Sequence, residues 1–449
     1  YFVTALYTGS GATRSIDNTI TAQDGTETGE AFKFGPDFVW LKARTGGSYH
    51  HNAYDTVRGA TKALEVDDTD AEATISDALT SFNSNGFSLG ADASDREANE
   101  SGRPMVAWNW KASDSSSATY TVKVVSDSGN KYRFDDFGTS AVTLNLHETG
   151  TYTFDQSDSS NSGHPLRFSA TSDGTHGGGS EYTTGVTVTG TPGTAGAKTV
   201  IVVAASAPTL YYYCSVHSGM GGQANTNVTE GSSNFAGSII STVSANTTAG
   251  FSVVTYTGNA TAGATVGHGL GVAPAMVIVK SRSATESWEV AHQSLAATQT
   301  IRLNSTAAAS TTADFNNTRP SATVFTIGSY TGTNQNSGTY VSYCFAGVEG
   351  YSKISSYIGN GSTDGPFIYT GFRPAFIMFR STILCNWVIV DSARSTFNVM
   401  DDSLYPNTSG SEITTITAVD FLSNGFKWRA NLPNETNASG QTYIYMAFA

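Results

Sequence analysis

The chain has 449 residues and is acidic, with 24 Lys and Arg against 37 Asp and Glu and a formal net charge of −13. Because no basic cluster interrupts this negative charge, the surface is expected to repel phosphate backbones, which excludes nucleic acid as a partner. Apolar runs stop short of the roughly 20 residues that a membrane-spanning helix needs, so no membrane insertion is expected. Only 14% of the residues are charged, against roughly 25% in average soluble domains, a texture typical of extracellular and virion β proteins.

The composition predicts an all-β protein. Glycine occurs 46 times, Tyr 21 times and Phe 23 times, and no long stretch shows a 3.6-residue apolar period. The length suits four domains of roughly 100 residues, which we expect to be tandem β-sandwiches. We place a first repeat at 1–116, a domain of a different kind at 117–226, and two further repeats at 227–349 and 350–449. Since the chain begins inside an expected strand, we expect it to be a fragment of a longer protein.

Three related segments define the repeats, and an internal repeat determines the architecture before any single residue does. Each repeat opens with an aromatic-led strand that closes on Tyr-x-Gly, at 1–9, 251–258 and 351–359. Each continues with a proline-led strand, at 36–42, 274–280 and 374–380. Each ends in a strand that alternates large and small residues, at 106–112, 340–346 and 443–449, as expected of a strand with one buried face. Short connections between such domains predict a stiff rod.

Two shorter motifs recur in the first and third repeats. Asp55-Thr-Val-Arg58 returns as Asp391-Ser-Ala-Arg394 and is missing from the second repeat. Such a pair could bind sugar, but a structural ion pair or a turn is the favoured interpretation. Ser-Asn-Gly-Phe occurs at 84–87 and 423–426, where Asn-Gly is expected to supply the positive φ angles of a tight hairpin.

Two features of the first repeat leave alternatives open. Residues 67–81 are the best helical candidate, yet their Ser and Thr content makes a pair of strands equally acceptable. His50 and His51 are adjacent, and neighbours on a strand point to opposite faces, so we expect exposed loop residues rather than ligands. The Trp residues could offer stacking platforms for carbohydrate, but Trp108 and Trp110 share one strand face and are expected to be core.

The segment Tyr211-Tyr-Tyr-Cys-Ser-Val-His-Ser-Gly-Met220 places a thiol, an imidazole and a thioether in one short loop. These are Cys214, His217 and Met220, and His164 lies 50 residues before the cysteine. Two His, one Cys and a weak axial Met form the ligand set of a blue-copper site. The plain alternative is that Cys214 is a buried packing residue. His176, in a glycine-rich loop, is a spare ligand.

These residues make the stretch from about 120 to 222 resemble a cupredoxin, with the Cys-x2-His-x2-Met loop of its short-loop members. The resemblance implies a Greek-key sandwich and a copper ion held by His164, Cys214, His217 and Met220. Copper is therefore the expected cofactor. An electron-transfer or copper-carrying protein is one possible function.

The repeats, with their Tyr-x-Gly opening, proline-led strand and Tyr-Ile-Tyr-Met-Ala-Phe-Ala ending, resemble modules of virion structural proteins from marine tailed phages. That resemblance implies a non-enzymatic fibre or decoration protein of the virion that self-associates as a homotrimer or filament and contacts other virion proteins. A glycan or receptor on the host surface is an expected partner. No ordered catalytic motif is present, so we expect no enzyme. A cell-surface filament or adhesin is the remaining alternative.

Overall fold

The computed structural model describes residues 2–17, 34–93, 98–113, 117–414, 418–430 and 435–449. These residues form eight β-sheets, which confirms the predicted all-β fold of tandem sandwich domains. Their helices are short: α1 (Thr331–Asn334) and the 3-10 turns η1 (Ser159–Asn161) and η2 (Gly174–Gly177). No helix in the described ranges has the length and apolar character needed to cross a membrane.

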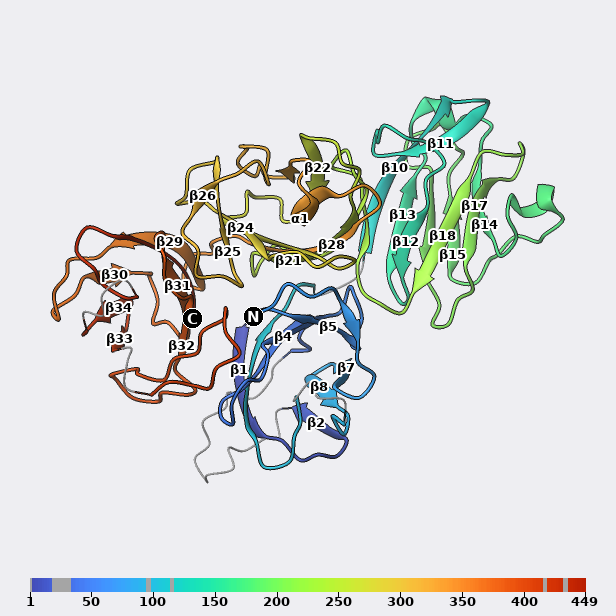
Figure 1. Cartoon of the computed structure of the whole chain (residues 1–449). Coiled ribbons are helices and arrows are strands. Elements are labelled where there is room, and N and C mark those ends of the chain that lie inside the picture. The colour runs from blue at the N-terminus through green and yellow to red at the C-terminus, as the bar shows by residue number, and fades with distance from the viewer. Residues whose placement is uncertain (1, 18–33, 94–97, 114–116, 415–417, 431–434) are drawn as a thin grey trace.

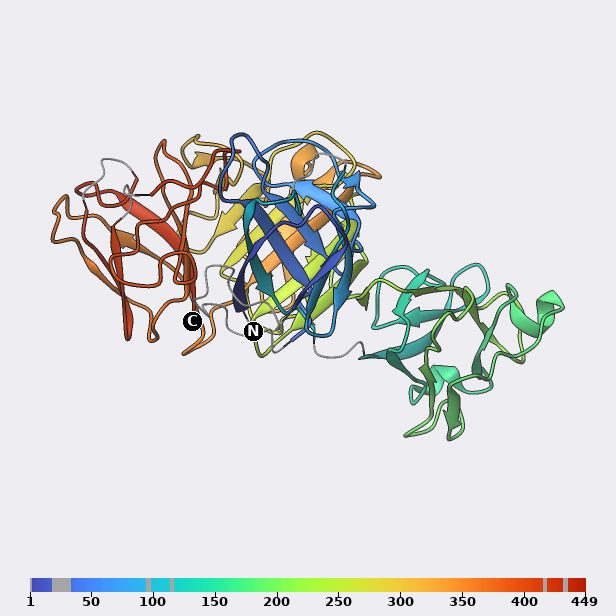
Figure 2. The same cartoon turned by 90° about the horizontal axis from the view of Figure 1, so that it is seen from below.

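Three sandwiches cluster into one body, and a fourth stands to its side (Figures 1 and 2). The first repeat contains β1 (Phe2–Thr8), β2 (Arg14–Asp17), β3 (Phe38–Ala43), β4 (Asn52–Asp55), β5 (Lys62–Glu65), β6 (Ala73–Thr74), β7 (Leu79–Asn83), β8 (Gly86–Leu89) and β9 (Pro104–Trp110). Its larger sheet has the order β1-β9-β3-β4-β5-β6 and its smaller sheet the order β2-β8-β7.

The second repeat contains β19 (Ser232–Asn234), β20 (Ser241–Asn246), β21 (Phe251–Thr257), β22 (Ala264–Gly267), β23 (Met276–Ser281), β24 (Glu289–His292), β25 (Gln299–Arg302), β26 (Ser310–Thr311), β27 (Val324–Ile327) and β28 (Thr339–Phe345). The third contains β29 (Ser352–Ile358), β30 (Phe367–Tyr369), β31 (Phe376–Ser381), β32 (Val388–Asp391), β33 (Val419–Leu422), β34 (Gly425–Trp428) and β35 (Thr442–Phe448). The strand orders β21-β28-β23-β24 and β29-β35-β31-β32 repeat the β1-β9-β3-β4 order of the first repeat.

The Tyr-x-Gly opening has the same packing role in all three repeats. The tyrosine hydroxyl donates to a backbone carbonyl late in the repeat, at distances of 2.6, 2.7 and 2.7 Å; the pairs are Tyr7 with Ala98, Tyr256 with Thr333 and Tyr357 with Thr436. The glycine lies so close to that segment that an added Cβ would be 2.1–2.3 Å from a carbonyl oxygen. Only glycine therefore fits two residues after this tyrosine.

The central strands of the repeats are buried on both faces. Every residue of β3, β23 and β31 is buried, and so are all but the first residue of β9, β28 and β35. One face of each sheet packs on the smaller sheet of its own repeat. The other face enters a single core to which all three repeats contribute. The expectation of one buried face is wrong, because neighbouring repeats cover the second face.

The shared core has pseudo-three-fold symmetry. Trp110, Phe345 and Phe448 occupy equivalent positions at the ends of β9, β28 and β35. Their ring centroids form a nearly equilateral triangle with sides of 6.2, 5.8 and 6.1 Å. The repeats are therefore arranged around an axis rather than end to end, and the predicted rod is wrong for this part of the chain. Closure around the axis buries the large apolar sheet faces, which would be exposed to water in a rod.

The Asp-x-x-Arg motif lies at the interfaces between repeats. Asp55 and Arg58 are fully buried and 2.5 Å apart, and the hydroxyl of Tyr343 in the second repeat donates to Asp55 at 2.8 Å. Glu72 extends the pair, because Arg58 and Arg282 of the second repeat both bind its carboxylate, at 3.2 and 2.8 Å. Burial disfavours the charge of Arg58, but Asp55, Tyr343 and Glu72 outweigh this and raise its pKa. The structural ion pair is thus confirmed.

The same network joins the third repeat to the first. The carboxylate of Asp391 binds Arg394 at 2.6 Å and accepts a hydrogen bond from the indole of Trp108 at 2.9 Å. Glu412 then connects Arg394 to Arg44, at 2.9 and 2.7 Å. Trp108 and Tyr343 hold equivalent places in β9 and β28, so a different aromatic donor meets the aspartate at each of the two interfaces.

The interface between the second and third repeats lacks this network as a whole. At the positions equivalent to Asp55, Arg58, Glu72, Arg282 and Tyr343, this interface has His292, Leu295, Ala309, Thr382 and Met446. One backbone hydrogen bond is common to both interfaces. The N–H of Ala309 donates to the carbonyl of Thr382 at 2.9 Å, and at the equivalent place the N–H of Glu72 donates to the carbonyl of Arg282 at 2.9 Å. Met446 offers no donor in place of Tyr343 or Trp108, and Leu295 offers no cation, so an aspartate at position 292 would lack both its partner across the interface and its ion pair. This explains why the motif is absent from the second repeat.

Buried cations reinforce every interface. Lys42, Lys280 and Arg380 are equivalent residues of the proline-led strands, and each is at most 1% exposed. Lys42 donates to the carbonyl of Ser409 at 3.0 Å and Lys280 to that of Thr69 at 2.8 Å, each in a neighbouring repeat. Arg380 likewise binds carbonyls of the second repeat. Each repeat therefore anchors itself to a loop of the next.

Three smaller expectations for the first repeat are corrected. Residues 67–81 form no helix; β6 and the start of β7 lie there and pair with β5 and β8, not with each other. The Ser-Asn-Gly-Phe hairpin exists, but Asn85 does not have a positive φ. Gly86 is required because an added Cβ would lie 2.0 Å from the carbonyl oxygen of Ile16. His51 is buried, stacks on Trp108 and accepts a hydrogen bond from the Trp40 indole at 3.0 Å.

The sandwich beside the body contains β10 (Ser117–Ser126), β11 (Asn130–Phe134), β12 (Leu144–His147), β13 (Thr151–Asp155), β14 (Leu166–Ser169), β15 (Val186–Thr189), β16 (Lys198–Val202), β17 (Leu210–Cys214) and β18 (Gly222–Asn227). Its sheets have the orders β11-β10-β13-β16-β15 and β12-β18-β17-β14 and enclose a separate core. β10 pairs in parallel with β13, and β12 with β18. The sandwich contacts the second repeat near Ser233, whose carbonyl accepts from the Tyr120 hydroxyl at 3.0 Å.

We predict that Arg58→Leu lowers the free energy of unfolding by about 3–5 kcal/mol, because it leaves the Asp55 carboxylate buried without its cation. Urea unfolding followed by tryptophan fluorescence measures the change. Arg373→Leu, at an exposed position, is the control and should change the stability by less than about 0.5 kcal/mol. Equal stability of the two variants would contradict the bridging role of Arg58.

Candidate metal centre

Three of the four expected ligands meet at one end of the separate sandwich. The Sγ of Cys214 is 3.7 Å from Nδ1 of His217 and 3.9 Å from Nδ1 of His164. The donor atoms of the three residues all lie within 4.8 Å of one another, and the two imidazole rings are 4.6 Å apart. β17 delivers Cys214 as its last residue, and β14 begins two residues after His164.

Pairing of β14 with β17 sets this proximity. Leu166 lies opposite Cys214 in the antiparallel register, so the residues just before β14 are brought beside the cysteine. The N–H of Ser215 donates to the carbonyl of Pro165 at 3.1 Å and continues the ladder past the strand end. The 50-residue gap between His164 and Cys214 in the sequence is thus closed by a strand pair.

Buried polar groups fix the backbone at His164. Its carbonyl accepts hydrogen bonds from the Tyr132 hydroxyl and the Gln156 amide, both at 2.9 Å. Gln156 also accepts from the N–H of Leu166 at 3.0 Å, and Asn161 accepts through its carbonyl from the N–H of His164 at 2.8 Å. Sequence reasoning missed Tyr132, Gln156 and Asn161, because they act on backbone atoms and match no ligand pattern.

Hydrogen bonds also fix the loop that follows Cys214. The N–H of His217 donates to the Cys214 sulfur at 3.4 Å, and the N–H of Gly219 donates to Asp173 at 2.8 Å. His176, the spare ligand, lies outside the group, since its Nε2 is 3.0 Å from the backbone oxygen of Cys214. It supports the cysteine from the side of η2 instead.

The donors differ in exposure. Cys214 is buried, His164 is intermediate and His217 is exposed, so the group lies just under the surface. Met220 is 1% exposed and lines the same opening as His217. Burial and then the neighbouring His217 lower the pKa of His164, which favours the neutral imidazole that a metal requires.

The geometry fits a shared ion. Metal bonds of about 2.0–2.3 Å to nitrogen and sulfur place two donors about 3.5 Å apart around a single ion. The sulfur-to-nitrogen distances of 3.7 and 3.9 Å therefore need only small adjustments. A thiolate with two imidazoles suits copper and zinc, and a thioether as an additional ligand would favour copper.

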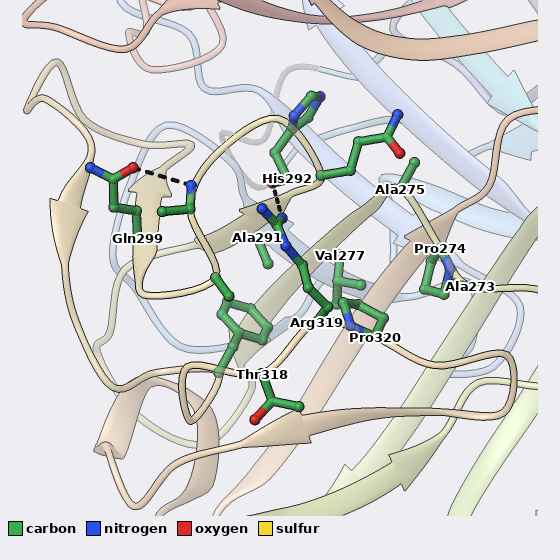
Figure 3. Close-up of a pocket in the computed structure, with 14 residues that line it drawn as sticks. Ala273, Pro274, Ala275, Val277, Ala291, His292, Gln299, Thr318, Arg319 and Pro320 are labelled. Atoms are coloured by element: carbon green, nitrogen blue, oxygen red, sulfur yellow. Dashed lines mark hydrogen bonds between the residues drawn. The ribbon is translucent and has the colours of Figure 1, made fainter.

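A separate cavity of about 210 Å³ lies in the second repeat, near His292 and Arg319 (Figure 3). Arg319 donates to the carbonyl of His292 at 2.9 Å and to that of Leu295. Burial lowers the pKa of His292 to about 4, so the ring is neutral at neutral pH. Small apolar residues and Phe315 form much of the remaining wall. Because the Arg319 guanidinium is already bound to backbone carbonyls, the cavity offers no group of donors comparable to that at Cys214.

The fold and this donor group define a multi-domain β-sandwich protein that carries one module of a different kind among three repeats. A family model described as a domain of unknown function (DUF7483) matches residues 1–135 and 224–449, and the chain belongs to this family. The unmatched residues 136–223 contain His164, Cys214, His217 and Met220. Neither the curated proteins nor the solved structures contain a match to the chain.

We predict that Gln156→Leu weakens copper binding about 10- to 100-fold, because the carbonyl of His164 and the N–H of Leu166 both lose a partner. Isothermal titration with copper(II) measures the affinity. Gln223→Leu, on β18 of the same sandwich, is the matched control and should bind as the unaltered protein does. Unchanged affinity in a folded Gln156→Leu variant would show that His164 needs no such support.

Proposed function

We propose that the protein is a non-enzymatic structural protein of a phage virion appendage, a fibre or decoration, and that its separate sandwich is a cupredoxin-like module that binds copper. The cluster of His164, Cys214 and His217 carries the copper proposal, because two imidazoles and a thiol converge there within 4.8 Å. Met220 supplies the weak fourth ligand, since it lines the same opening. When bound, copper would supply a redox-active centre and a link between two loops.

The positions of the four ligands favour one of these two roles of copper, the link between loops, over the redox-active centre. Cys214, His217 and Met220 belong to one loop, and His164 belongs to another that Tyr132 and Gln156 hold in place. An ion bound to both loops would add its binding energy to the stability of the folded sandwich. Stabilisation of a displayed module is therefore the favoured role of the metal.

Electron transfer is the second candidate, and the exposure of the site edge favours it. His217 is exposed, and the adjacent Val216 side chain is 57% exposed. An apolar residue beside an exposed ligand gives a redox partner a place to approach closely. This function rests on the same four ligands as the structural one.

The body supports the virion proposal through its rigidity and surface. Its three repeats share one core and are joined by buried charges, which suits a particle that must survive outside a cell. The chain is poor in charge, and a polar surface with few charges suits close contact with further copies, with other virion proteins or with a host glycan. Tail or baseplate genes next to its own would distinguish this role from that of a cell-surface filament or adhesin.

We predict that copper(II) produces an intense visible thiolate-to-copper absorption band with one copper per chain, and raises the melting temperature of the sandwich. Cys214→Ser should abolish the band and the copper-dependent gain in melting temperature. Cys385→Ser, in the third repeat, is the control and should keep both. A colourless, metal-free and folded protein after copper addition would overturn the copper proposal and leave the virion proposal intact.

We also predict that the protein self-associates as a homotrimer or filament at micromolar concentration. The three-fold packing of repeats is achieved within one chain, so this expectation rests on the virion role and the weakly charged surface. Sedimentation velocity measures the mass. A stable monomer of 47.1 kDa would count against an assembly formed by this chain alone.

A further inference from the structure

The smaller sheet of the third repeat presents apolar side chains to solvent. Pairing of β30 with β34 and of β34 with β33 forms two outward rows, Phe367 with Lys427 and Asp420, and Tyr369 with Gly425 and Leu422. The residues that alternate with these rows belong to the core of the repeat, namely Ile368, Phe426 and Phe421. The two aromatic rings therefore lie on the outer side of the sheet, where Phe367 is 45% and Tyr369 62% exposed.

The segment 397–400 continues this sheet beyond β33. Met400 forms a β-bridge with Val419, and the side chain of Asn398 bonds the backbone N–H and carbonyl of Phe421 at 2.9 and 3.1 Å. The neighbours of Asn398 are exposed and apolar: Phe397 is 82% and Val399 41% exposed. We call the resulting surface the outer apolar face; it comprises Phe367, Tyr369, Leu422, Phe397 and Val399.

The other two repeats show that the fold does not require aromatic residues at this place. The residues equivalent to Phe367 and Tyr369 are small or polar in both, namely Ser15 and Asp17 in β2, and Thr265 and Gly267 in β22. In the first repeat the hydroxyl groups of Ser15 and Ser88 are 3.2 Å apart across this sheet. The aromatic rings are thus particular to the third repeat, and a gathering of exposed apolar side chains is typical of an interaction site.

The charges of this face are balanced, although the chain as a whole carries a net charge of −13. The rows contain Lys427 and Asp420, which form ion pairs with Asp364 at 2.7 Å and with Arg429 at 2.5 Å. Two copies of so acidic a chain repel each other, and this repulsion is weakest where a surface is locally neutral. Acidic and basic groups on one rim can also pair crosswise in a contact between two identical surfaces.

We propose that the outer apolar face of the third repeat is a contact between two copies of this chain, which pack there face to face around a two-fold axis. The contact places aromatic and branched apolar side chains at its centre and the ion pairs at its rim, as is usual for protein interfaces. Figure 1 shows β30, β34 and β33 on the outer side of the third repeat, with β31 and β32 between them and the other repeats. A second copy can therefore reach this face.

A carbohydrate fits the outer apolar face less well than a second copy does. Sugar hydroxyls need hydrogen-bonding groups beside the aromatic rings, whereas Lys427 and Arg429 already bind carboxylates. Leu422 and Val399 present branched aliphatic side chains, which lack the ring on which a sugar stacks. An apolar sheet surface of a second copy covers all of these side chains.

This contact rests on the self-association proposed for the virion protein, and it names the surface that mediates it. A two-fold contact joins copies in pairs. Such pairs are compatible with a filament, in which a second kind of contact links one pair to the next, but not with a closed trimer.

The test compares the unaltered full chain with the double variant Phe367→Ser and Tyr369→Asp, which carries the residues of the first repeat at these places. Sedimentation velocity at micromolar concentration should show pairs or larger assemblies of the unaltered protein, and a dissociation constant at least about 10-fold higher for the variant. Hydrogen exchange of the unaltered protein should be slower in β30 at high than at low concentration. This second measurement does not depend on whether the variant folds.

The matched control is Val228→Ser with Val272→Asp, which also removes two exposed apolar side chains and adds one carboxylate. It should assemble as the unaltered protein does. Equal assembly of the two double variants, both folded by circular dichroism, would overturn the proposed contact and leave self-association through another surface, and the virion proposal, intact.

A monomeric unaltered protein would overturn this contact together with any assembly formed by the chain alone. Binding of that monomer to immobilised neutral oligosaccharides, lost in the variant with Phe367→Ser and Tyr369→Asp, would assign the outer apolar face to carbohydrate instead. Neither result depends on whether the separate sandwich binds copper.

Discussion

The packing of three sheet faces around Trp110, Phe345 and Phe448 is the constraint on which the rest of the body depends. Each repeat has its own core beneath its smaller sheet, but its outer sheet face is as apolar as its inner one. Such a face is stable only when it is removed from water. Closure around an axis buries all three faces together, and this closure forces charged residues such as Asp55 and Arg58 into the interfaces, where they must be paired.

Much of the fold could be predicted from the sequence, because repeat motifs and strand patterns are local. The arrangement of the three repeats around an axis could not be predicted in this way. Alternation of large and small residues in β9 indicates a strand, but small residues such as Ala107 also fill a buried face, so alternation alone does not show that both faces are covered. The same limit applies to His51, since a histidine pair looks like an exposed loop until the indole that covers it is placed by another strand.

The candidate copper site, too, could be predicted from the sequence only in part. His164, Cys214, His217 and Met220 were identifiable because ligand types and short spacings are visible in a sequence. Tyr132 and Gln156 were not, because their effect passes through the backbone carbonyl of His164, which any residue would offer.

The unequal interfaces also affect how the chain reaches this structure. Three similar repeats on one chain could pair in the wrong order, or exchange places with repeats of another molecule, and misassembly of this kind is characteristic of repetitive proteins. Asp55 requires the hydroxyl of Tyr343, and Asp391 requires the indole of Trp108, whereas Met446 satisfies neither aspartate. A wrong pairing would therefore bury a carboxylate against a thioether. The absence of the network from one of the three interfaces thus favours a single order of the repeats around the axis.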